Sequence, residues 1–402
     1  MATPREDLFE EILKPEHRAN PYPLWKALNV ETVTRARDGS FIVTGYEPVR
    51  QIFQDPRMSA DPRNQQSGEE QGEQPAFALL DPPLHDRLRR LTMKHFGPPQ
   101  RPSYIANLRE DIERIVDEHL DRLVGKTRFD LVAEFAYPLP VAVISQVAGM
   151  PLEDEEKLSE WSEAISTELE FLNDEDGSLA EKRAQAGGEL AEYFSALFEK
   201  LRRTPGDNLL SHLVNDDAED AMNEEELLGT ANLLLIGGHE TTVSLISNAM
   251  FQLMQNRSSW DALQERPELV TPLIEEVLRL DPPVQFRVRN ALADVVIDGV
   301  TITKGSTVIA AIAAANRDEK VFDRPDSFDI ERNPRPHLSF SGGIHFCFGA
   351  PLGRLEGQVA IAALLRRLKN PRLVEEKVEY RLSPETRGPK RLLIEVDEVT
   401  RK

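Results

Sequence analysis

The stretch Phe340-Ser-Gly-Gly-Ile-His345-Phe-Cys347-Phe-Gly349-Ala-Pro-Leu-Gly-Arg354 contains the only cysteine among the 402 residues. One cysteine cannot form an intrachain disulfide, a multi-cysteine zinc site or a cysteine-ligated iron–sulfur cluster. It can serve as a nucleophile, as a single axial metal ligand or as an inert buried thiol. The glycines before and after Cys347 would let the backbone approach a flat ligand closely. We therefore favour the role of ligand.

The residues after Cys347 indicate the start of a helix that runs to about Leu368. Ala350-Pro351 opens an apolar run, and proline is tolerated in the first turn of a helix. A cysteine just ahead of such a start faces free backbone N–H groups and the positive end of the helix dipole. We expect both to stabilise a thiolate at Cys347.

Charge and composition exclude several classes of function. A net charge of −21 argues against non-specific binding to nucleic acid or to anionic membranes, because both need a basic surface. The N-terminus lacks a signal-peptide pattern, and no apolar run reaches the roughly 18 residues that span a bilayer. We expect a cytoplasmic protein with no membrane attachment. Since no linker interrupts the chain, we expect one domain over residues 1–402.

The pattern along the chain predicts an α+β fold that is mostly helical, with small antiparallel sheets. Asp38-Gly39 and Asp298-Gly299 lie between short apolar runs, which is typical of hairpins. Residues 61–75 are polar and rich in Gln, Glu and Gly, which indicates an exposed, mobile loop. Helical spacing dominates between residues 84 and 275, with separate helices expected at 112–123, from 138 onward and at 190–201.

A long central helix is predicted from Asn223 to about residue 256. It begins with a sequence that resembles a capping box, and its middle reads Gly237-Gly238-His239-Glu240-Thr241 within an apolar run. Glycines and a glutamate are costly there. A widened, π-like turn would open a groove for a small ligand beside Glu240 and Thr241. The alternative is tight helix packing at the glycines, with Thr241 bonded back to its own helix.

Two further groups carry charge. Glu276 and Arg279 are three residues apart and can pair on one helix face; taken alone, this pattern favours a solvated surface ion pair. His85 and Arg89 share a helix face in the same way. Together with Arg289 and His345 they could hold a bound dianion, although each one alone is more typical of a surface or core residue.

Together these residues resemble one family, the cytochrome P450 monooxygenases, and in particular the soluble bacterial members. Four motifs occur in the order of that family: Gly237–Thr242, Glu276-x-x-Arg279, the irregular segment near 316–332, and Phe340-x-x-Gly-x-His345-x-Cys347-x-Gly349. The resemblance covers about residues 21–396. Gly237 and Gly353 stand where alanine is common in the family, which does not put the chemistry in doubt.

The resemblance implies a haem b cofactor with Cys347 as the proximal iron ligand, since a thiolate pushes electron density to iron. Gly349 and the neighbouring aromatic residues would shield the sulfur and supply N–H groups to it. The same carry-over places His85, Arg89, Arg289 and His345 on the haem propionates. It makes Glu276 and Arg279 a structural pair that braces the irregular segment.

Thr241 and Glu240 match the alcohol–acid pair of the family. A hydroxyl at the distal face can order the water that delivers protons, and a nearby carboxylate can connect that water to solvent. An alternative for Glu240 is an ion pair with a distant Arg or Lys. The substrate would lie on the haem face opposite Cys347, and from segment position we expect its pocket to involve Phe77, Leu233, Leu234, Gly237, Gly238, Val284, Gln285 and Phe286.

The leading hypothesis is a monooxygenase that inserts one atom of O₂ into a small to medium apolar molecule. The chain lacks a nucleotide-binding glycine fingerprint, which implies a separate ferredoxin or flavodoxin with an NAD(P)H-dependent reductase. That partner would dock near Cys347 on a local positive patch formed by Arg87, Arg90, Lys94, Arg354 and Arg366.

Three alternatives remain. A haem-thiolate peroxygenase or isomerase would need no redox partner, but the retained Glu240-Thr241 pair argues against it because peroxide already carries its protons. A haem protein that only senses or stores a ligand would not need this pair either. A cysteine hydrolase is disfavoured because no Asn or Asp partner pattern accompanies Cys347.

Overall fold

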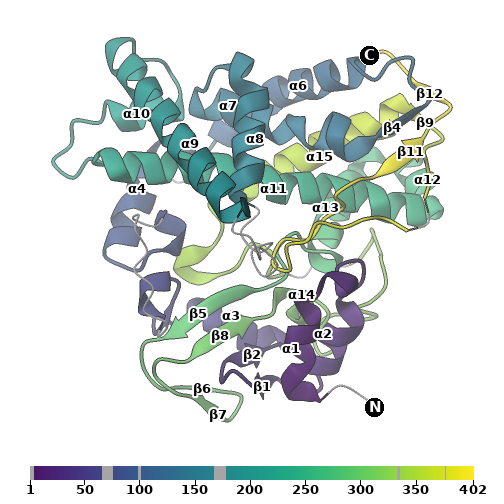
Figure 1. Cartoon of the computed structure of the whole chain (residues 1–402). Coiled ribbons are helices and arrows are strands. Elements are labelled where there is room, and N and C mark those ends of the chain that lie inside the picture. Colours follow the sequence, from purple (N-terminus) through teal and green to yellow (C-terminus); the bar gives the residue numbers. More distant parts are fainter. Residues whose placement is uncertain (1–3, 66–75, 98–100, 167–177, 333–335, 376) are drawn as a thin grey trace.

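The computed structural model describes residues 4–65, 76–97, 101–166, 178–332, 336–375 and 377–402. Most of the helices lie together in the upper part of Figure 1, whereas the largest sheet lies below them with the N-terminal helices. The helices are α1 (Leu8–Ile12), α2 (Tyr22–Leu28), α3 (Tyr46–Gln54), α4 (Leu84–Phe96), α5 (Tyr104–Asn107), α6 (Arg109–Asp121), α7 (Pro138–Ala148), α8 (Glu155–Ser166), α9 (Ser178–Arg203), α10 (Leu209–Val214), α11 (Glu224–Gln255), α12 (Arg257–Glu265), α13 (Val270–Leu280), α14 (Ile312–Ala315) and α15 (Ala350–Arg367).

The strands form small sheets. The largest has the order β1-β2-β8-β5-β3, in which β2 and β8 are parallel and the other pairs antiparallel. Three smaller sheets have the orders β10-β11-β4, β12-β9 and β6-β7. The strands are β1 (Val33–Arg35), β2 (Phe41–Val43), β3 (Met58–Ser59), β4 (Arg128–Asp130), β5 (Arg287–Ala291), β6 (Val295–Ile297), β7 (Val300–Ile302), β8 (Thr307–Ala310), β9 (Leu368–Lys369), β10 (Arg372–Leu373), β11 (Leu393–Glu395) and β12 (Glu398–Val399).

The central helix α11 crosses the molecule (Figure 1) and begins as the sequence predicts. The side chain of Asn223 accepts a hydrogen bond from the backbone N–H of Glu226, and the Glu226 carboxylate accepts one from the backbone N–H of Asn223. This capping box satisfies two N–H groups that a helix start leaves open. α11 packs against α7, α8, α13 and α15, so its middle lies inside the helical core.

The predicted α+β class, mostly helical with small sheets, is confirmed. Both hairpins form, and Gly39, Asp298 and Gly299 have positive φ angles of 90°, 47° and 80°. The predicted helix at 190–201 is part of the longer α9. Of the exposed loop predicted over 61–75, Asp61 is buried, contrary to the prediction, whereas Arg63 and Asn64 are exposed as predicted. Residues 66–75 lie outside the described residues.

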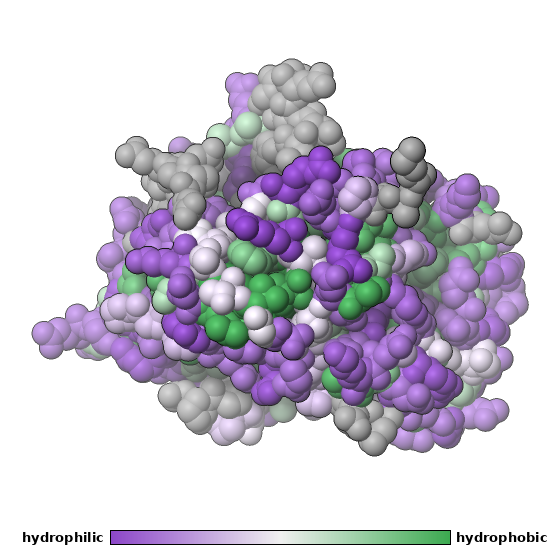
Figure 2. Space-filling view, turned by 90° about the horizontal axis from the view of Figure 1, so that it is seen from below, coloured by the Kyte–Doolittle hydropathy of each residue, from purple (hydrophilic) through white to green (hydrophobic). Residues whose placement is uncertain are grey.

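The surface of the molecule is largely polar. Figure 2 shows the face at the bottom of Figure 1, where hydrophilic side chains surround a smaller hydrophobic area near the centre. Across the described ranges, no helix combines the length and apolar character needed to cross a membrane.

Candidate functional site

Cys347 lies in a tightly shaped loop between a short 3-10 helix, Gly343–His345, and α15. Its backbone N–H donates to the carbonyl of Phe340 at 2.9 Å, which closes the loop. Gly343 has a φ of 61°, and a Cβ there would lie 2.2 Å from the carbonyl oxygen of Phe53. Only glycine fits this position, so the backbone that carries Cys347 is fixed against α3.

The thiol of Cys347 is exposed, but the surrounding protein removes bulk water. Burial raises the pKa of the thiol, while hydrogen bonding from the backbone N–H of Gly349 and the charges of Arg287 and Arg89 act in the opposite direction. The expected N–H donation is therefore present. These N–H groups favour the thiolate as expected, but in the protein alone desolvation outweighs them; a bound metal cation would reverse this balance.

The four predicted basic residues converge beside Cys347. The rings of His85 and His345 lie 4.7 Å apart, and Arg89 donates to the carbonyl of Phe346 at 2.7 Å. Arg289 on β5 is 6% exposed. Burial, followed by repulsion from Arg289, His85 and Arg89, lowers the pKa of His345 to about 3, so all four groups lie within electrostatic reach of one another.

This basic cluster has unused hydrogen-bonding capacity. In the part of the chain that the structure describes, Nε2 of His85 and Nδ1 of His345 are buried without a hydrogen-bond partner. Burial, with repulsion from Arg287, also lowers the pKa of Arg289 to about 10. Buried ring nitrogens without hydrogen-bond partners are costly. A bound anion would offset the repulsion and favour the protonated rings, whose N–H groups could then donate to it.

The middle of α11 presents a partly open face. Gly237 is exposed, and Leu233, Glu240 and Thr241 are partly exposed. The prediction of a π-like turn is wrong, since α11 is an uninterrupted α-helix. Thr241 instead donates to the carbonyl of Gly237 at 3.0 Å. A π-helical turn occurs elsewhere, at Val132–Ala136.

The start of α15 packs against the middle of α11. A Cβ placed on Gly353 would lie 3.8 Å from Oγ1 of Thr242, so α15 contacts α11 one residue beyond Thr241. The carboxylate of Glu240 forms an ion pair with Arg381 at 3.0 Å. Sequence reasoning allowed a distant cation here but did not identify Arg381, because no local pattern links two residues so far apart in the chain.

The predicted pocket residues fall into two groups. Leu233 and Gly237 lie on the partly open face of α11, whereas Leu234 is buried in the helical core. A Cβ on Gly238 would contact Ile144 of α7 at 3.5 Å, so this glycine faces a neighbouring helix.

The remaining pocket candidates are buried. Phe77 packs at a tilt against Phe348 with ring centroids 5.3 Å apart, and Phe286 packs edge-on against Phe9 with ring centroids 5.4 Å apart. Val284 belongs to the core of the five-stranded sheet, and Gln285 is 2% exposed. These contacts argue against a pocket role for Phe77 and Phe286, whose side chains are taken up by core packing.

Glu276 and Arg279 form a buried bracing pair, so the interpretation as a surface ion pair is wrong. Both side chains are 3% exposed, and Arg279 Nε lies 2.8 Å from Glu276 Oε2. Arg279 also donates to the carbonyls of Asn316 and Pro325. Arg332 adds a second guanidinium to Glu276 at 3.1 Å. The pair therefore holds the irregular segment, as the resemblance implies.

Most of the predicted positive patch is neutralised. Arg87 pairs with Glu226, and Arg90 pairs with Asp220. Lys94 lies 3.0 Å from Asp216, and Arg354 lies 2.7 Å from Glu275. Burial alone would raise the pKa of Glu275, but hydrogen bonds from His337 and Arg354 lower it to about 2. Of the five predicted residues, Arg366 is exposed near the end of α15.

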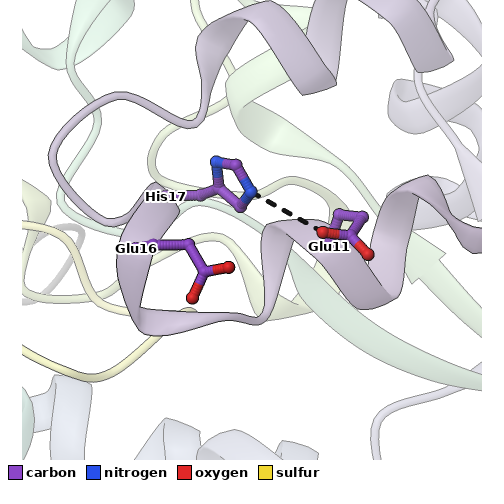
Figure 3. Close-up of side chains that lie close together, drawn as sticks. All are labelled: Glu11, Glu16 and His17. Atoms are coloured by element: carbon purple, nitrogen blue, oxygen red, sulfur yellow. Dashed lines mark ion pairs between the residues drawn. The ribbon is translucent and has the colours of Figure 1, made fainter. Parts of the chain in front are cut away.

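A small acidic group lies far along the chain from this site. Among the described residues, Glu11, Glu16 and His17 have ligand atoms within 4.8 Å of one another. Figure 3 shows His17 facing Glu11, with 3.7 Å between Nε2 and Oε2. Lys14 already pairs with Glu11 at 2.6 Å. Exposed acidic clusters of this kind are common and do not by themselves indicate a metal site.

Comparison with known proteins identifies the family to which a chain with this Cys347 loop belongs. The family model described as Cytochrome P450 matches residues 29–385, which is most of the 402 residues. The chain belongs to the cytochrome P450 family. It is a haem-thiolate monooxygenase, an oxidoreductase that acts with O₂ and redox partners.

Individual cytochromes P450 are similar over nearly the whole chain. The biotin biosynthesis cytochrome P450 of Bacillus subtilis (strain 168) is 36% identical over 91% of this chain and 93% of its own length. The vitamin D(3) 25-hydroxylase of Pseudonocardia autotrophica is 39% identical over 86% of this chain and 85% of its own. The ligand-free structure of Mycobacterium smegmatis CYP164A2 superposes with a TM-score of 0.89 at 36% identity, covering 97% and 100% of the two chains.

The residues present fit the haem of this cytochrome P450. Haem carries two propionates, and the basic cluster supplies positive charge together with buried ring nitrogens that lack a hydrogen-bond partner. An exposed thiol lies beside that cluster, and α15, which follows the thiol in the chain, packs against α11. The thiol, a basic cluster that could bind an anion and a partly open helix face are thus provided by different elements of the chain.

Proposed function

We propose that Cys347 is the proximal ligand of a haem b whose propionates bind His85, Arg89, Arg289 and His345. The observation that carries this proposal is the exposed thiol beside a cluster of basic side chains with unsatisfied buried nitrogens. When bound, the haem supplies activation of O₂ and insertion of one oxygen atom into a C–H or C=C bond.

Backbone groups near Cys347 and the basic cluster would hold and orient the haem. The absence of a side chain at Gly349 keeps space beside the sulfur, since a Cβ there would lie 3.8 Å from Sγ of Cys347. Its N–H and the N–H of Ala350 donate toward the sulfur, and such donors tune the electron density of a thiolate ligand. The basic cluster orients the cofactor through its two carboxylates.

On the opposite side, we infer that Thr241 and Glu240 handle protons. Thr241 Oγ1 is partly exposed on the open face of α11, where it can order a water molecule. Glu240 immediately precedes Thr241 and has its carboxylate paired with Arg381. A proton taken from solvent by this carboxylate can pass through ordered water to the hydroxyl of Thr241, which is the arrangement that general acid catalysis requires.

We further propose a small to medium apolar substrate, since Leu233 and Gly237 line the open face of α11. Electrons would come from a separate ferredoxin or flavodoxin with an NAD(P)H-dependent reductase, because the chain has no further cysteine for an iron–sulfur cluster. The single cysteine also supports a reducing, cytoplasmic compartment. A screen for compounds that convert the haem from low to high spin would identify the substrate class.

The second candidate is a peroxide-driven haem-thiolate peroxygenase or isomerase. The Glu240-Thr241 pair disfavours it, because peroxide brings its own protons and needs no such delivery. Turnover with hydrogen peroxide that equals or exceeds turnover with O₂ and a redox chain would reverse this ranking.

Replacement of Cys347 tests the ligand assignment. We expect the reduced wild-type protein with carbon monoxide to show the Soret band typical of thiolate ligation. Cys347→His should move that band to the position typical of histidine ligation, while Val296→Ala, an exposed change on β6, should leave it in place. A Cys347→His spectrum identical to that of the wild type would refute the assignment.

Replacement of Thr241 tests proton delivery. We expect Thr241→Ala to keep the carbon monoxide spectrum and the substrate-induced spin change, because neither needs the hydroxyl. The yield of product per electron should fall by about 100-fold, the lower end of the range for loss of a proton-transfer group, and hydrogen peroxide should rise correspondingly. Product and peroxide are measured in the same assay, and unchanged yields would remove Thr241 from the mechanism.

A further inference from the structure

The carboxylate of Glu240 is held by an arginine from the C-terminal part of the chain. Nη1 of Arg381 lies 3.0 Å from Oε1 of Glu240, and the two side chains are 14% and 15% exposed. Arg381 lies between β10 and β11, where its backbone N–H donates to the carbonyl of Gly388 at 3.1 Å. Tyr380 and Pro389 form a bridge at the same place. The backbone of Arg381 is therefore anchored.

Neighbouring contacts restrict both partners further. The guanidinium of Arg381 lies 5.8 Å from the ring centre of Tyr137, the residue that follows the π-helical turn. Tyr137 in turn packs edge-on against the ring of His239, with centroids 4.4 Å apart. Nε2 of His239 lies 3.1 Å from the Tyr137 carbonyl, and Nδ1 lies 2.9 Å from the hydroxyl of Ser162.

These distances assign the hydrogen on His239. A carbonyl can only accept, so Nε2 carries the hydrogen and Nδ1 accepts from Ser162. Full burial, with repulsion from Arg381, lowers the pKa of His239 to about 3, so the ring is neutral. The residue directly before Glu240 is thus locked to α8 and to the start of α7, which leaves the Glu240 side chain as the adjustable group at this point of α11.

We propose that Arg381 is a positioning residue for proton delivery, which fixes the carboxylate of Glu240 beside Thr241. This inference rests on the proposed role of Glu240. Without Arg381, a largely buried carboxylate would lose a neighbouring positive charge, and this loss would favour binding of a proton or rotation toward solvent. Either change removes the fixed group that passes a proton toward Oγ1 of Thr241 and regains one from water.

The experiment compares Arg381→Gln, Arg381→Lys, Glu240→Gln and the double variant Glu240→Gln/Arg381→Gln. Arg391→Gln is the matched control, because Arg391 lies in the same C-terminal part, is 49% exposed and has its nearest carboxylates 3.8 and 3.9 Å away. Each holoenzyme is assayed for its carbon monoxide spectrum, substrate Kd, product per electron, hydrogen peroxide and the effect of D₂O on the rate of product formation.

We expect Arg381→Gln to keep the carbon monoxide spectrum and the substrate Kd while product per electron falls about 10-fold and the D₂O effect increases. Arg381→Lys should recover part of the yield because it keeps the charge. The double variant should be no worse than Glu240→Gln. Independently of activity, thermal unfolding without substrate should give non-additive Tm shifts for the two single variants, which reports their direct contact.

The outcomes separate this inference from the proposed function. If Glu240→Gln lowers the product yield but Arg381→Gln and Arg381→Lys do not, Arg381 has no positioning role and the function of Glu240 stands. If Glu240→Gln has the wild-type yield, the proposed function of Glu240 fails together with this inference. If Arg381→Gln loses the carbon monoxide spectrum, Arg381→Lys is used in its place. The inference would be overturned if Arg381→Lys shows the same D₂O effect as the wild type and if its Tm shift adds to that of Glu240→Gln.

Discussion

At the scale of single residues, the same local pattern has opposite consequences in two places. Glu276 and Arg279 are three residues apart and 3% exposed, whereas Glu47 and Arg50 have the same spacing but are 62% and 46% exposed. A surface ion pair contributes little because water screens it. A buried charge that loses its partner remains uncompensated, so burial rather than spacing determines the energetic weight of each pair.

This contrast gives a prediction for Glu276→Gln. The substitution leaves the guanidinium groups of Arg279 and Arg332 without their shared carboxylate, and we expect the free energy of unfolding to fall by about 3–5 kcal/mol. Glu47→Gln should change it by less than about 1 kcal/mol. Urea unfolding of both variants measures the two losses of unfolding free energy. Equal losses would show that the buried pair at Glu276 contributes no more to stability than a surface ion pair.

At the scale of elements, the glycines of the two central helices differ in their surroundings. A Cβ on Gly237 of α11 would meet only Leu233 of the same helix, at 3.6 Å, among the described atoms within 4 Å. A Cβ on Gly357 of α15 would lie 3.1 Å from Leu245 and 3.2 Å from Ile274. Gly357 therefore lets α15 pack closely on α11 and α13, whereas Gly237 leaves open space.

The two glycines should thus respond oppositely to alanine. We expect Gly237→Ala to raise the free energy of unfolding by about 0.5–1 kcal/mol, because alanine loses less backbone entropy in a helix. Gly357→Ala should lower it by about 1–3 kcal/mol through overpacking. Thermal unfolding of the two variants measures whether each substitution raises or lowers stability. A destabilised Gly237→Ala would mean that this glycine serves helix packing after all.

At the scale of the whole molecule, His239 joins three helical segments, since it lies on α11 and bonds to Ser162 of α8 and to Tyr137 at the start of α7. Burial lowers its pKa from 6.5 to about 3. Between these values the unfolded chain binds a proton that the folded protein does not. Stability is therefore complete above pH 6.5 and is lost as the pH falls toward 3.

We expect His239 to contribute a loss of about 1.4 kcal/mol for each pH unit below 6.5. Urea unfolding between pH 7.5 and 4.5 measures this slope. His239→Gln should reduce the slope although it lowers stability at neutral pH. His17→Gln, at a partly exposed surface position, is the control and should leave the slope as in the wild type. A slope that His239→Gln does not change would contradict the assignment.

Local sequence determined a large share of this protein. The capping box at Asn223, the hairpin turns at Gly39 and Gly299, and the loop that carries Cys347 depend on residues close together in the chain, so spacing and turn chemistry were sufficient to predict them. The motif around Cys347 is also specific enough by itself to indicate the family, because its glycines, histidine and cysteine lie at fixed spacings within one short segment.

Only the tertiary structure decided how distant residues meet. It paired Glu240 with Arg381, neutralised most of the expected positive patch with Asp216, Asp220, Glu226 and Glu275, and buried Glu276 with Arg279. It also replaced the expected π-like turn with a regular helix. These outcomes depend on packing between segments far apart in the chain and on the burial that results, and neither is encoded in local periodicity.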